Sequence, residues 1–495
     1  MKLYLNGHAY RYAVEQMLLV LFPEERPTYP DTLPKPEEDA VISTLHRGEK
    51  WTTAQTVLQR GGVSYRRFAR ARTETLRGKL ETDRILQKII KLSFFKAACD
   101  CTGDTPAWGA LTGIRPAKLV TRMLEEGKSE AQAMKVLRDV YHVTEQRRLL
   151  CLDAAKAGLA VKRSLQPEEI SLYVGIPFCP TRCAYCSFVS HSVEKSMALV
   201  APYLEALHEE IRDAGEVVRQ SGLRLKSVYI GGGTPTTLSA LQLTALMECI
   251  ADAFDLTRLE EYTVEAGRPD TITEEKLKAI FAGGATRISI NPQTMRDQVL
   301  ERIGRRHNAA EIPKVMGIAR SVGFDNINMD LIAGLPGDDL EGFCFTIDET
   351  IALGPENITV HTLALKKGSR LSLEGGELPT SAQVEQMLHY ANERLRAQGY
   401  RPYYLYRQKF MAGNFENVGW CLPGKEGIYN ICIMEELHTI LSLGAGGTTK
   451  LVNPQSGLIE RVCNPKYPYE YMDRMDRIKE GKERLTSFHQ AFSQS

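Results

Sequence analysis

The chain has 495 residues, of which 43% are hydrophobic, and its 62 Lys and Arg nearly balance 61 Asp and Glu. This balance excludes a protein that binds polyanions over its whole surface. The apolar run from Met17 to Phe22 is far shorter than the roughly 20 residues of a membrane span, and polar Asn6 and His8 interrupt any signal peptide. We therefore expect a cytoplasmic protein without a membrane segment, built from two or three domains.

Residues 1–165 form the first predicted domain, an accessory domain with excess positive charge. They contain 28 Lys and Arg against 19 Asp and Glu, whereas the remainder contains 34 against 42. We expect this domain to be mostly helical, and its basic run to be a helix whose charges are solvated or attract the acidic remainder. That interpretation argues against a nucleic-acid partner; the alternative is a site for an anionic ligand or RNA. The run consists of Arg60, Arg66, Arg67, Arg70, Arg72, Arg77, Lys79 and Arg84.

Three of the 11 cysteines, Cys179, Cys183 and Cys186, stand close together with the spacing C-x3-C-x2-C. Chance placement would give this triple about 0.005 times in such a chain. Three thiolates can ligate three irons of a [4Fe-4S] cluster and leave the fourth iron open to a ligand with nitrogen and oxygen donors. The alternatives are three core cysteines or a zinc knuckle completed by a histidine such as His191, although zinc sites usually pair their ligands as C-x2-C.

This motif, with the aromatic Tyr185 before its third cysteine, resembles the signature of the radical S-adenosylmethionine enzymes. The resemblance implies that the three cysteines hold a [4Fe-4S] cluster and that S-adenosylmethionine chelates the open iron. An electron from the cluster would then cleave the sulfonium to a 5′-deoxyadenosyl radical. The resemblance also implies an electron donor that reduces the cluster.

After residue 171, short β-branched runs alternate with amphipathic stretches, which predicts an α/β fold with parallel strands. The radical enzymes use an incomplete (β/α)6 barrel, which we expect at residues 166–370, followed by a C-terminal α/β region at 371–495 that covers the substrate. The predicted strands are Ser171 to Phe178, Ser227 to Gly231, Tyr262 to Ala266, Thr286 to Asn291, Asn326 to Ile332 and Asn357 to Leu363. The predicted helices are Leu199 to Gln220, Ala240 to Ala253, Glu274 to Phe281, Ala309 to Val322 and Leu340 to Leu353.

In such a barrel the functional residues sit where the strands end. The second predicted strand ends in Tyr229-Ile-Gly-Gly-Gly-Thr-Pro235. We expect exposed backbone N–H groups there to bind the carboxylate of an amino acid, because glycine lets a ligand approach closely. The run resembles the family's methionine-binding motif, which implies that Gly232, Gly233 and Thr234 contact S-adenosylmethionine.

Further strand ends carry polar residues, each of which alone would usually be solvated or cap a helix. The runs Asn328-Met-Asp-Leu-Ile-Ala-Gly-Leu-Pro336 and Ile290-Asn-Pro-Gln293 resemble the oxygen-independent coproporphyrinogen III dehydrogenases. The resemblance implies cofactor contacts from Tyr173, Tyr185, Glu265, Gln293, Arg305, Asp330, Thr362 and Thr448.

The runs Gly427-Ile-Tyr-Asn430, Leu443-Gly-Ala-Gly-Gly447 and Leu111-Thr-Gly-Ile-Arg-Pro116 resemble the HemZ group of that branch. The resemblance implies a porphyrinogen or haem-type ligand, and oxidative decarboxylation of coproporphyrinogen III propionates to vinyl groups, with an outside electron acceptor. Cations and tyrosines in one C-terminal stretch would suit a tetra-anionic macrocycle, or would form an ordinary strand edge. They are Arg401, Tyr403, Tyr404, Tyr406, Arg407 and Lys409.

Two departures from the family pattern leave alternatives open. Phe188 stands where the dehydrogenases have a further cysteine, which resembles the haem chaperones. Those chaperones share a His-Asn-x-x-Tyr-Trp run, whereas this chain has Glu416-Asn-Val-Gly-Trp420, and a carboxylate is a poor substitute for imidazole on haem iron. The alternatives are therefore a haem-binding, chaperone-like protein and a radical methyltransferase that acts on haem.

Overall fold

The computed structural model describes the chain except residues 31, 33, 36, 187–190, 193–195, 366–368, 372–376, 409–413, 494 and 495. Phe188 and Lys409 thus lie outside the described residues, and of His191 only the backbone is described. The chain divides into two compact units, Met1–Leu152 and Asp153–Ser495. The division falls inside helix α5 (Glu145–Ser164), earlier than the boundary predicted at residue 165.

The first unit is not mostly helical, and on this point the prediction was wrong. It contains a four-stranded sheet in the order β1-β2-β3-β4, with β1 parallel to β2 and the other neighbours antiparallel. The strands are β1 (Lys2–Asn6), β2 (Ala40–Arg47), β3 (Trp51–Arg60) and β4 (Val63–Arg72). The helices are α1 (Arg11–Leu21), α2 (Lys79–Thr102), α3 (Ala117–Glu125), α4 (Glu130–Asp139) and the first part of α5.

Much of the basic run predicted to be a helix forms strand β4. Tyr65, Ala69 and Ala71 pack against the core of the unit, whereas Arg66 and Phe68 are exposed. This alternation has the period of two that a strand with one buried face requires. Arg66, Arg70 and Arg72 occupy the alternate, exposed positions, whereas Arg67 lies on the side of Tyr65 and pairs with Asp100 of α2 at 2.7 Å. The pattern of apolar residues, and not the charge, therefore decides the local structure.

The second unit is built on an 11-stranded sheet in the order β13-β14-β12-β11-β10-β9-β8-β5-β15-β16-β17. The neighbours from β5 to β12 all pair in parallel, which confirms the α/β barrel strands. Each predicted strand is present within a few residues of its expected position. These strands are β5 (Glu169–Ile176), β8 (Arg224–Gly232), β9 (Glu261–Gly267), β10 (Arg287–Gln293), β11 (Ile327–Ala333) and β12 (Asn357–Thr362).

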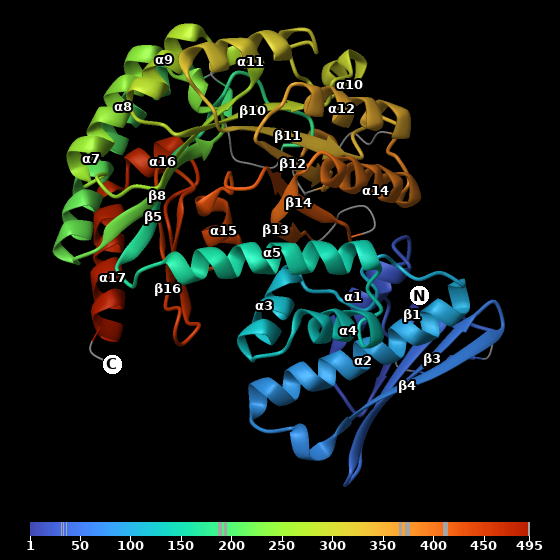
Figure 1. The fold of residues 1–495 in the computed structure, drawn as a ribbon. Coiled ribbons are helices and arrows are strands. Elements are labelled where there is room, and N and C mark those ends of the chain that lie inside the picture. Colours follow the sequence, from blue (N-terminus) through green and yellow to red (C-terminus); the bar gives the residue numbers. More distant parts are fainter. Residues whose placement is uncertain are drawn as a thin grey trace. The chain divides into compact units, whose positions relative to one another are not determined.

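The predicted helices between these strands are also present, and Figure 1 shows α7, α8, α9 and α11 along the outer side of the curved sheet. The helices are α7 (Val200–Gln220), α8 (Ala240–Ala253), α9 (Glu274–Ala282), α10 (Asp297–Arg302), α11 (Glu311–Val322) and α12 (Leu340–Ala352). Minor elements are strands β6 (Phe178–Cys179) and β7 (His191–Ser192), and 3-10 turns at Thr73–Thr75, Met197–Leu199, Pro235–Thr237 and Pro269–Thr271.

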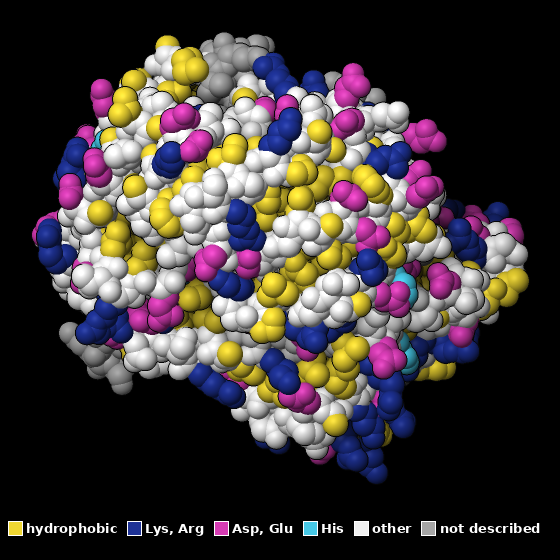
Figure 2. Space-filling model, turned by 45° about the horizontal axis from the view of Figure 1, so that its top comes forward, with side chains coloured by type: hydrophobic (Ala, Val, Ile, Leu, Met, Phe, Trp, Pro, Cys, Tyr) yellow, Lys and Arg dark blue, Asp and Glu magenta, His cyan; other side chains and the backbone are white. Residues whose placement is uncertain are grey.

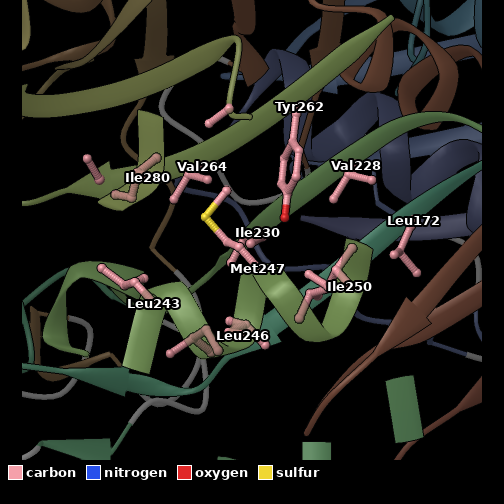
Figure 3. Close-up of a cluster of buried hydrophobic side chains, with 14 of the residues drawn as sticks. Leu172, Val228, Ile230, Leu243, Leu246, Met247, Ile250, Tyr262, Val264 and Ile280 are labelled. Atoms are coloured by element: carbon pink, nitrogen blue, oxygen red, sulfur yellow. The ribbon is translucent and has the colours of Figure 1, made fainter. Parts of the chain in front are cut away.

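The core of this unit lies between the strands and the outer helices. In Figure 3, Met247 of α8 lies among Ile230 of β8 and Val264 of β9, and all three side chains are buried. Along each strand the alternate residues point the other way, into the lumen enclosed by the sheet. In β10, for example, Ile288 and Ile290 belong to the outer core, whereas Arg287, Asn291 and Gln293 line the lumen.

The C-terminal α/β region predicted from residue 371 extends the barrel sheet. Strand β14 pairs with β12, and β15 pairs in parallel with β5, so both edges of the barrel sheet continue into C-terminal strands. The strands are β13 (Arg401–Arg407), β14 (Glu416–Cys421), β15 (Ile440–Leu443), β16 (Thr448–Val452) and β17 (Ile459–Cys463). The helices are α14 (Ser381–Ala397), α15 (Ile428–Glu435), α16 (Pro468–Met472) and α17 (Met475–Ser493).

A buried carboxylate ties this region to helix α7. Glu210 accepts hydrogen bonds from the Gly444 N–H at 2.7 Å and the Tyr471 hydroxyl at 2.6 Å, and pairs with Lys482 at 2.7 Å. Both charged side chains are almost completely buried.

The visible face in Figure 2 is mixed in charge. Figure 2 shows basic and acidic side chains interspersed with scattered apolar atoms over one face. Among the described residues, no helix combines the length and the apolar character needed to cross a bilayer.

Candidate functional site

A cavity of about 620 Å³ occupies the lumen of the second unit. It runs from strand-end residues such as Gly232, Gly267 and Gln293 down to residues at the starts of strands, such as Arg287 and Asn328. All of the residues predicted to bind the cluster or the cofactor line this cavity, although they come from distant parts of the chain. They are Tyr173, Cys179, Cys183, Tyr185, Cys186, Gly232, Gly233, Thr234, Glu265, Gln293, Arg305, Asp330, Thr362 and Thr448.

The three cysteines follow β5, with Cys179 at the end of β6, and the sulfur atoms of Cys179 and Cys183 accept hydrogen bonds. The Thr234 hydroxyl donates to Cys179 Sγ at 3.6 Å, and Arg268 Nη1 donates to Cys183 Sγ at 3.9 Å. In the described part of the chain, no three His, Cys, Asp or Glu side chains converge closely enough to hold a single metal ion. A cubane cluster needs no such convergence, because each thiolate binds a different iron.

Arg268 was not predicted as a site residue. It is only 3% exposed, forms an ion pair with Asp270 at 3.0 Å, and donates to the Thr181 hydroxyl at 2.7 Å as well as to Cys183. Hydrogen bonds to cluster sulfurs are among the features that set a cluster's potential. The available sequence signal was its position three residues after Glu265, just beyond the end of β9.

Arg305 and Tyr185 connect the cysteine loop to the strand ends. Arg305 Nη2 donates to the Tyr185 hydroxyl at 2.9 Å, and Nη1 donates to the Asn291 carbonyl at 3.4 Å. Burial alone would lower the pKa of Arg305, but the charges of Tyr185 and Cys183 outweigh it and raise that pKa. Arg305 is therefore a permanent cation beside the thiols, where it can pair with a carboxylate.

The glycine run packs tightly, and its N–H groups are not free as the sequence led us to expect. The Gly232 N–H donates to Glu265 Oε2 at 3.3 Å, and the Gly233 N–H donates to the Ile176 carbonyl at 2.7 Å. A Cβ atom on Gly233 would lie 2.4 Å from the Phe178 carbonyl oxygen. The glycines thus let the β8 turn pack directly against the chain that leads to Cys179.

Glu265 and Asp330 face the same cavity, but their pKa values shift in opposite directions. Burial raises the pKa of Glu265 to about 7, although the Tyr229 hydroxyl donates to Glu265 Oε1 at 2.5 Å. Burial would also raise the pKa of Asp330, but interactions with His361 and a hydrogen bond from Asn328 at 2.8 Å outweigh it, and that pKa is lowered. At neutral pH Asp330 is an anion, whereas Glu265 is a mixture of its protonated and ionised forms.

The remaining residues predicted to contact the cofactor differ in the hydrogen bonds that they already make within the protein. Gln293 adopts a left-handed backbone conformation, with φ 73°, at the end of β10. The Thr362 hydroxyl donates to the Glu416 carbonyl at 2.8 Å, and the Thr448 hydroxyl donates to Cys463 Sγ at 3.7 Å. Both hydroxyls keep acceptor capacity for a ligand.

Tyrosines form much of the wall of the lumen. The rings of Tyr229 and Tyr429 stack with centroids 4.4 Å apart, and Tyr173 stacks on both. Tyr404 and Tyr406, from the stretch predicted to hold a macrocycle, also line the cavity. Sequence reasoning missed Tyr229 and Tyr429, although both stand within motifs that it quoted.

Two arginines of that stretch are not brought into the cavity. Arg401 is exposed and donates to the carbonyls of Arg396 and Tyr400, and Arg407 is buried with its Nε donating to the Asn414 carbonyl. The expectation that they surround a macrocycle is therefore not met. The arginines that line the cavity are instead Arg268, Arg287 and Arg305. Of these, Arg287 was, like Arg268, not predicted as a site residue.

Comparison with known proteins agrees with this geometry. Residues 173–349 match the family model described as the Radical SAM superfamily. Over 386 residues the chain is 41% identical to the oxygen-independent coproporphyrinogen-III oxidase-like protein HemZ of Bacillus subtilis, with 77% of each chain covered. The chain belongs to the radical SAM superfamily, in its HemZ group.

Two further proteins match the chain at lower identity. The heme chaperone HemW of Bacillus subtilis is 32% identical over 60% of this chain and 77% of the relative. The solved structure of the coproporphyrinogen III oxidase HemN from Escherichia coli, a radical SAM enzyme, has the same fold. It aligns with a TM-score of 0.51 and 24% identity over 65% of this chain and 72% of that one.

As a radical SAM protein, the chain takes a [4Fe-4S] cluster and S-adenosylmethionine as its cofactors. The site fits both of these groups. Hydrogen-bond donors already face two of the three sulfurs. The cation Arg305 and the acids Glu265 and Asp330 share the cavity with them, and these are suitable partners for a carboxylate and for ribose hydroxyls.

Proposed function

We propose that this protein oxidatively decarboxylates propionate side chains of coproporphyrinogen III to vinyl groups and so forms protoporphyrinogen IX. The observation that carries the proposal is a single continuous cavity, which is lined both by the three thiols and by several tyrosine rings. Similarity to the HemZ protein and the fold shared with HemN support it. We place the reaction in the reducing cytosol, because exposed clusters are sensitive to oxygen.

When bound, the cofactors would supply a 5′-deoxyadenosyl radical able to remove one hydrogen atom from the β-carbon of a propionate. Loss of CO2 then forms the vinyl group and leaves one electron, which an outside acceptor takes. In our proposal Cys179, Cys183 and Cys186 hold the cluster, Arg305 pairs with the methionyl carboxylate, and Glu265 accepts from the ribose. The tyrosine rings pack against the macrocycle and exclude water from the reacting carbon.

A haem-carrying function is the second candidate, and similarity to HemW favours it. The residue at the position of the chaperones' haem-ligating histidine, Glu416, does not favour this function. Glu416 is 2% exposed and does not line the cavity, whereas its neighbour Asn417 does. The carboxylate of Glu416 is thus not presented to a ligand in the lumen.

The test is an anaerobic incubation of the reconstituted protein with S-adenosylmethionine, a reductant, an electron acceptor and coproporphyrinogen III. We expect protoporphyrinogen IX together with 5′-deoxyadenosine, one nucleoside for each propionate converted. The C183A variant serves as the control that lacks a complete cluster site. Stable binding of haem without either product would contradict the proposal and support the chaperone-like function.

A further inference from the structure

Arg287 lies at the first position of β10, deep in the lumen and far along the strand from Gln293. Its side chain is 1% exposed, yet it lines the cavity together with Asn291 and Gln293. The sequence around it alternates polar and apolar residues, and this alternation directs the guanidinium inward.

The guanidinium has no partner for much of its hydrogen-bonding capacity. Its Nε and Nη2 atoms are buried and make no hydrogen bond. Within the described residues, no carboxylate lies at ion-pair distance, although the pKa values of Glu261, Glu265 and Asp330 respond to its charge. Burial would lower the pKa of Arg287, but Tyr403 and Glu261 outweigh it and raise that pKa, so the guanidinium stays charged while two of its buried nitrogens make no hydrogen bond.

The nearby acids are already committed to other groups. Glu261 accepts from the Thr263 hydroxyl at 2.9 Å and from the Ile428 N–H at 2.5 Å. Glu265 and Asp330 are engaged by Tyr229 and Asn328, as described above. None of these carboxylates can turn to Arg287 without leaving a donor unpaired.

The surroundings suit an anionic ligand with an apolar body. Tyr229 and Tyr404 line the cavity and influence the pKa of Arg287. Burial raises the pKa of both phenols well above the ordinary value, so these hydroxyls remain protonated at neutral pH. The planar guanidinium matches a carboxylate in a two-bonded arrangement that Lys cannot reproduce.

We propose that Arg287 is the carboxylate-binding site of the lumen and anchors a propionate arm of the tetrapyrrole substrate. This inference rests on the proposed function for the identity of the substrate. The shared chemistry is a propionate on a tetrapyrrole, which could come from a coproporphyrinogen or from haem. The flexible arm can reach Arg287 while the ring system packs against Tyr229 and Tyr404, which line the same cavity.

The test compares ligands that differ only in their carboxylates, on the anaerobic holoprotein with S-adenosylmethionine bound. Coproporphyrin III, its tetramethyl ester and hemin are titrated, with ligand or protein fluorescence as the readout. We expect the wild-type protein to bind coproporphyrin III more tightly than the ester. R287Q should weaken binding of the acid about tenfold or more and leave binding of the ester unchanged.

Two further variants keep the test decisive. R287K retains the charge but not the planar group that makes two hydrogen bonds, so it should bind the acid with intermediate affinity. Because the charge is kept, R287K should fold even if R287Q does not. R407Q replaces a buried arginine that does not line the cavity, and it should preserve the preference for acid over ester. Equal loss for acid and ester in R287Q, or no acid preference in the wild type, would overturn the inference.

The same titrations separate this inference from the proposed reaction. If coproporphyrin III binds in a way that depends on Arg287 but no product forms, the role of Arg287 is supported and the proposed decarboxylation is contradicted. Arg287-dependent binding of hemin alone would assign the anchor to a haem carrier.

Discussion

At the scale of single residues, Glu265 controls how the cavity responds to pH. Burial raises the pKa of Glu265 to about 7, because the charged form loses its hydration. A carboxylate accepts two ribose hydroxyls well, whereas its protonated form gives up one acceptor site. The affinity for the nucleoside cofactor therefore depends on a group that titrates near neutrality.

We expect the holoprotein to bind S-adenosylmethionine about tenfold more tightly at pH 8 than at pH 6, because the ionised fraction of Glu265 rises by about that factor. E265Q should bind more weakly at pH 8 and show little dependence on pH. Equilibrium dialysis under argon measures both. The apoprotein supplies a check, since the raised pKa of Glu265 makes the fold less stable as pH rises from 4.5 to about 7, and E265Q should lack that decline. Identical profiles for the two proteins would refute the assignment.

Cys183 tests the cluster assignment directly. C183A should lower the iron content and abolish the charge-transfer absorption of the reconstituted protein while the melting temperature of the apoprotein changes little, because the thiol lies on a loop. C249A, which removes a thiol from outer helix α8, is the matched control and should keep its iron. Normal iron content in C183A would show that the thiol is not a ligand.

At the scale of elements, the turn after β8 shows how a glycine serves packing. G233A forces a Cβ atom against the carbonyl of Phe178, and we expect a loss of about 2 kcal/mol or more together with weaker S-adenosylmethionine binding. G317A is the control, because a Cβ atom there meets nothing within 4 Å and the residue lies inside α11. It should stabilise the helix by about 0.5–1 kcal/mol, as measured by urea unfolding. A G233A protein as stable as the wild type would contradict the packing argument.

The barrel could be predicted because its strands are short runs of buried β-branched residues bounded by turns. The first unit resisted prediction because β4 carries its arginines on a strand where only Tyr65, Ala69 and Ala71 mark the buried face. Motifs identified the residues at strand ends, which line one cavity as a group. Arg287 and Arg268 were not predicted as site residues, because the neighbouring sequence does not distinguish a buried arginine from a solvated one.

At the scale of the whole second unit, Glu210 joins helix α7 to the C-terminal segments. E210A leaves Lys482 buried without its partner and the Tyr471 hydroxyl without an acceptor, so we expect a loss of about 3–5 kcal/mol. D213A removes the exposed Lys479 pair from the same helix and should cost less than about 1 kcal/mol. Thermal unfolding of the full chain, followed at the transition of this unit, gives both values. Similar losses in the two variants would argue against a buried tie.

The pairing of β15 with β5 has a consequence for how the protein is made. Ile440 is synthesised long after its partner Ser171, so on the ribosome one border of the growing sheet stays unpaired until the final part of the chain emerges. During that interval the thiol loop has already been translated and the lumen lacks one wall. The thiols are thus reachable from solvent before the last strands complete the sheet.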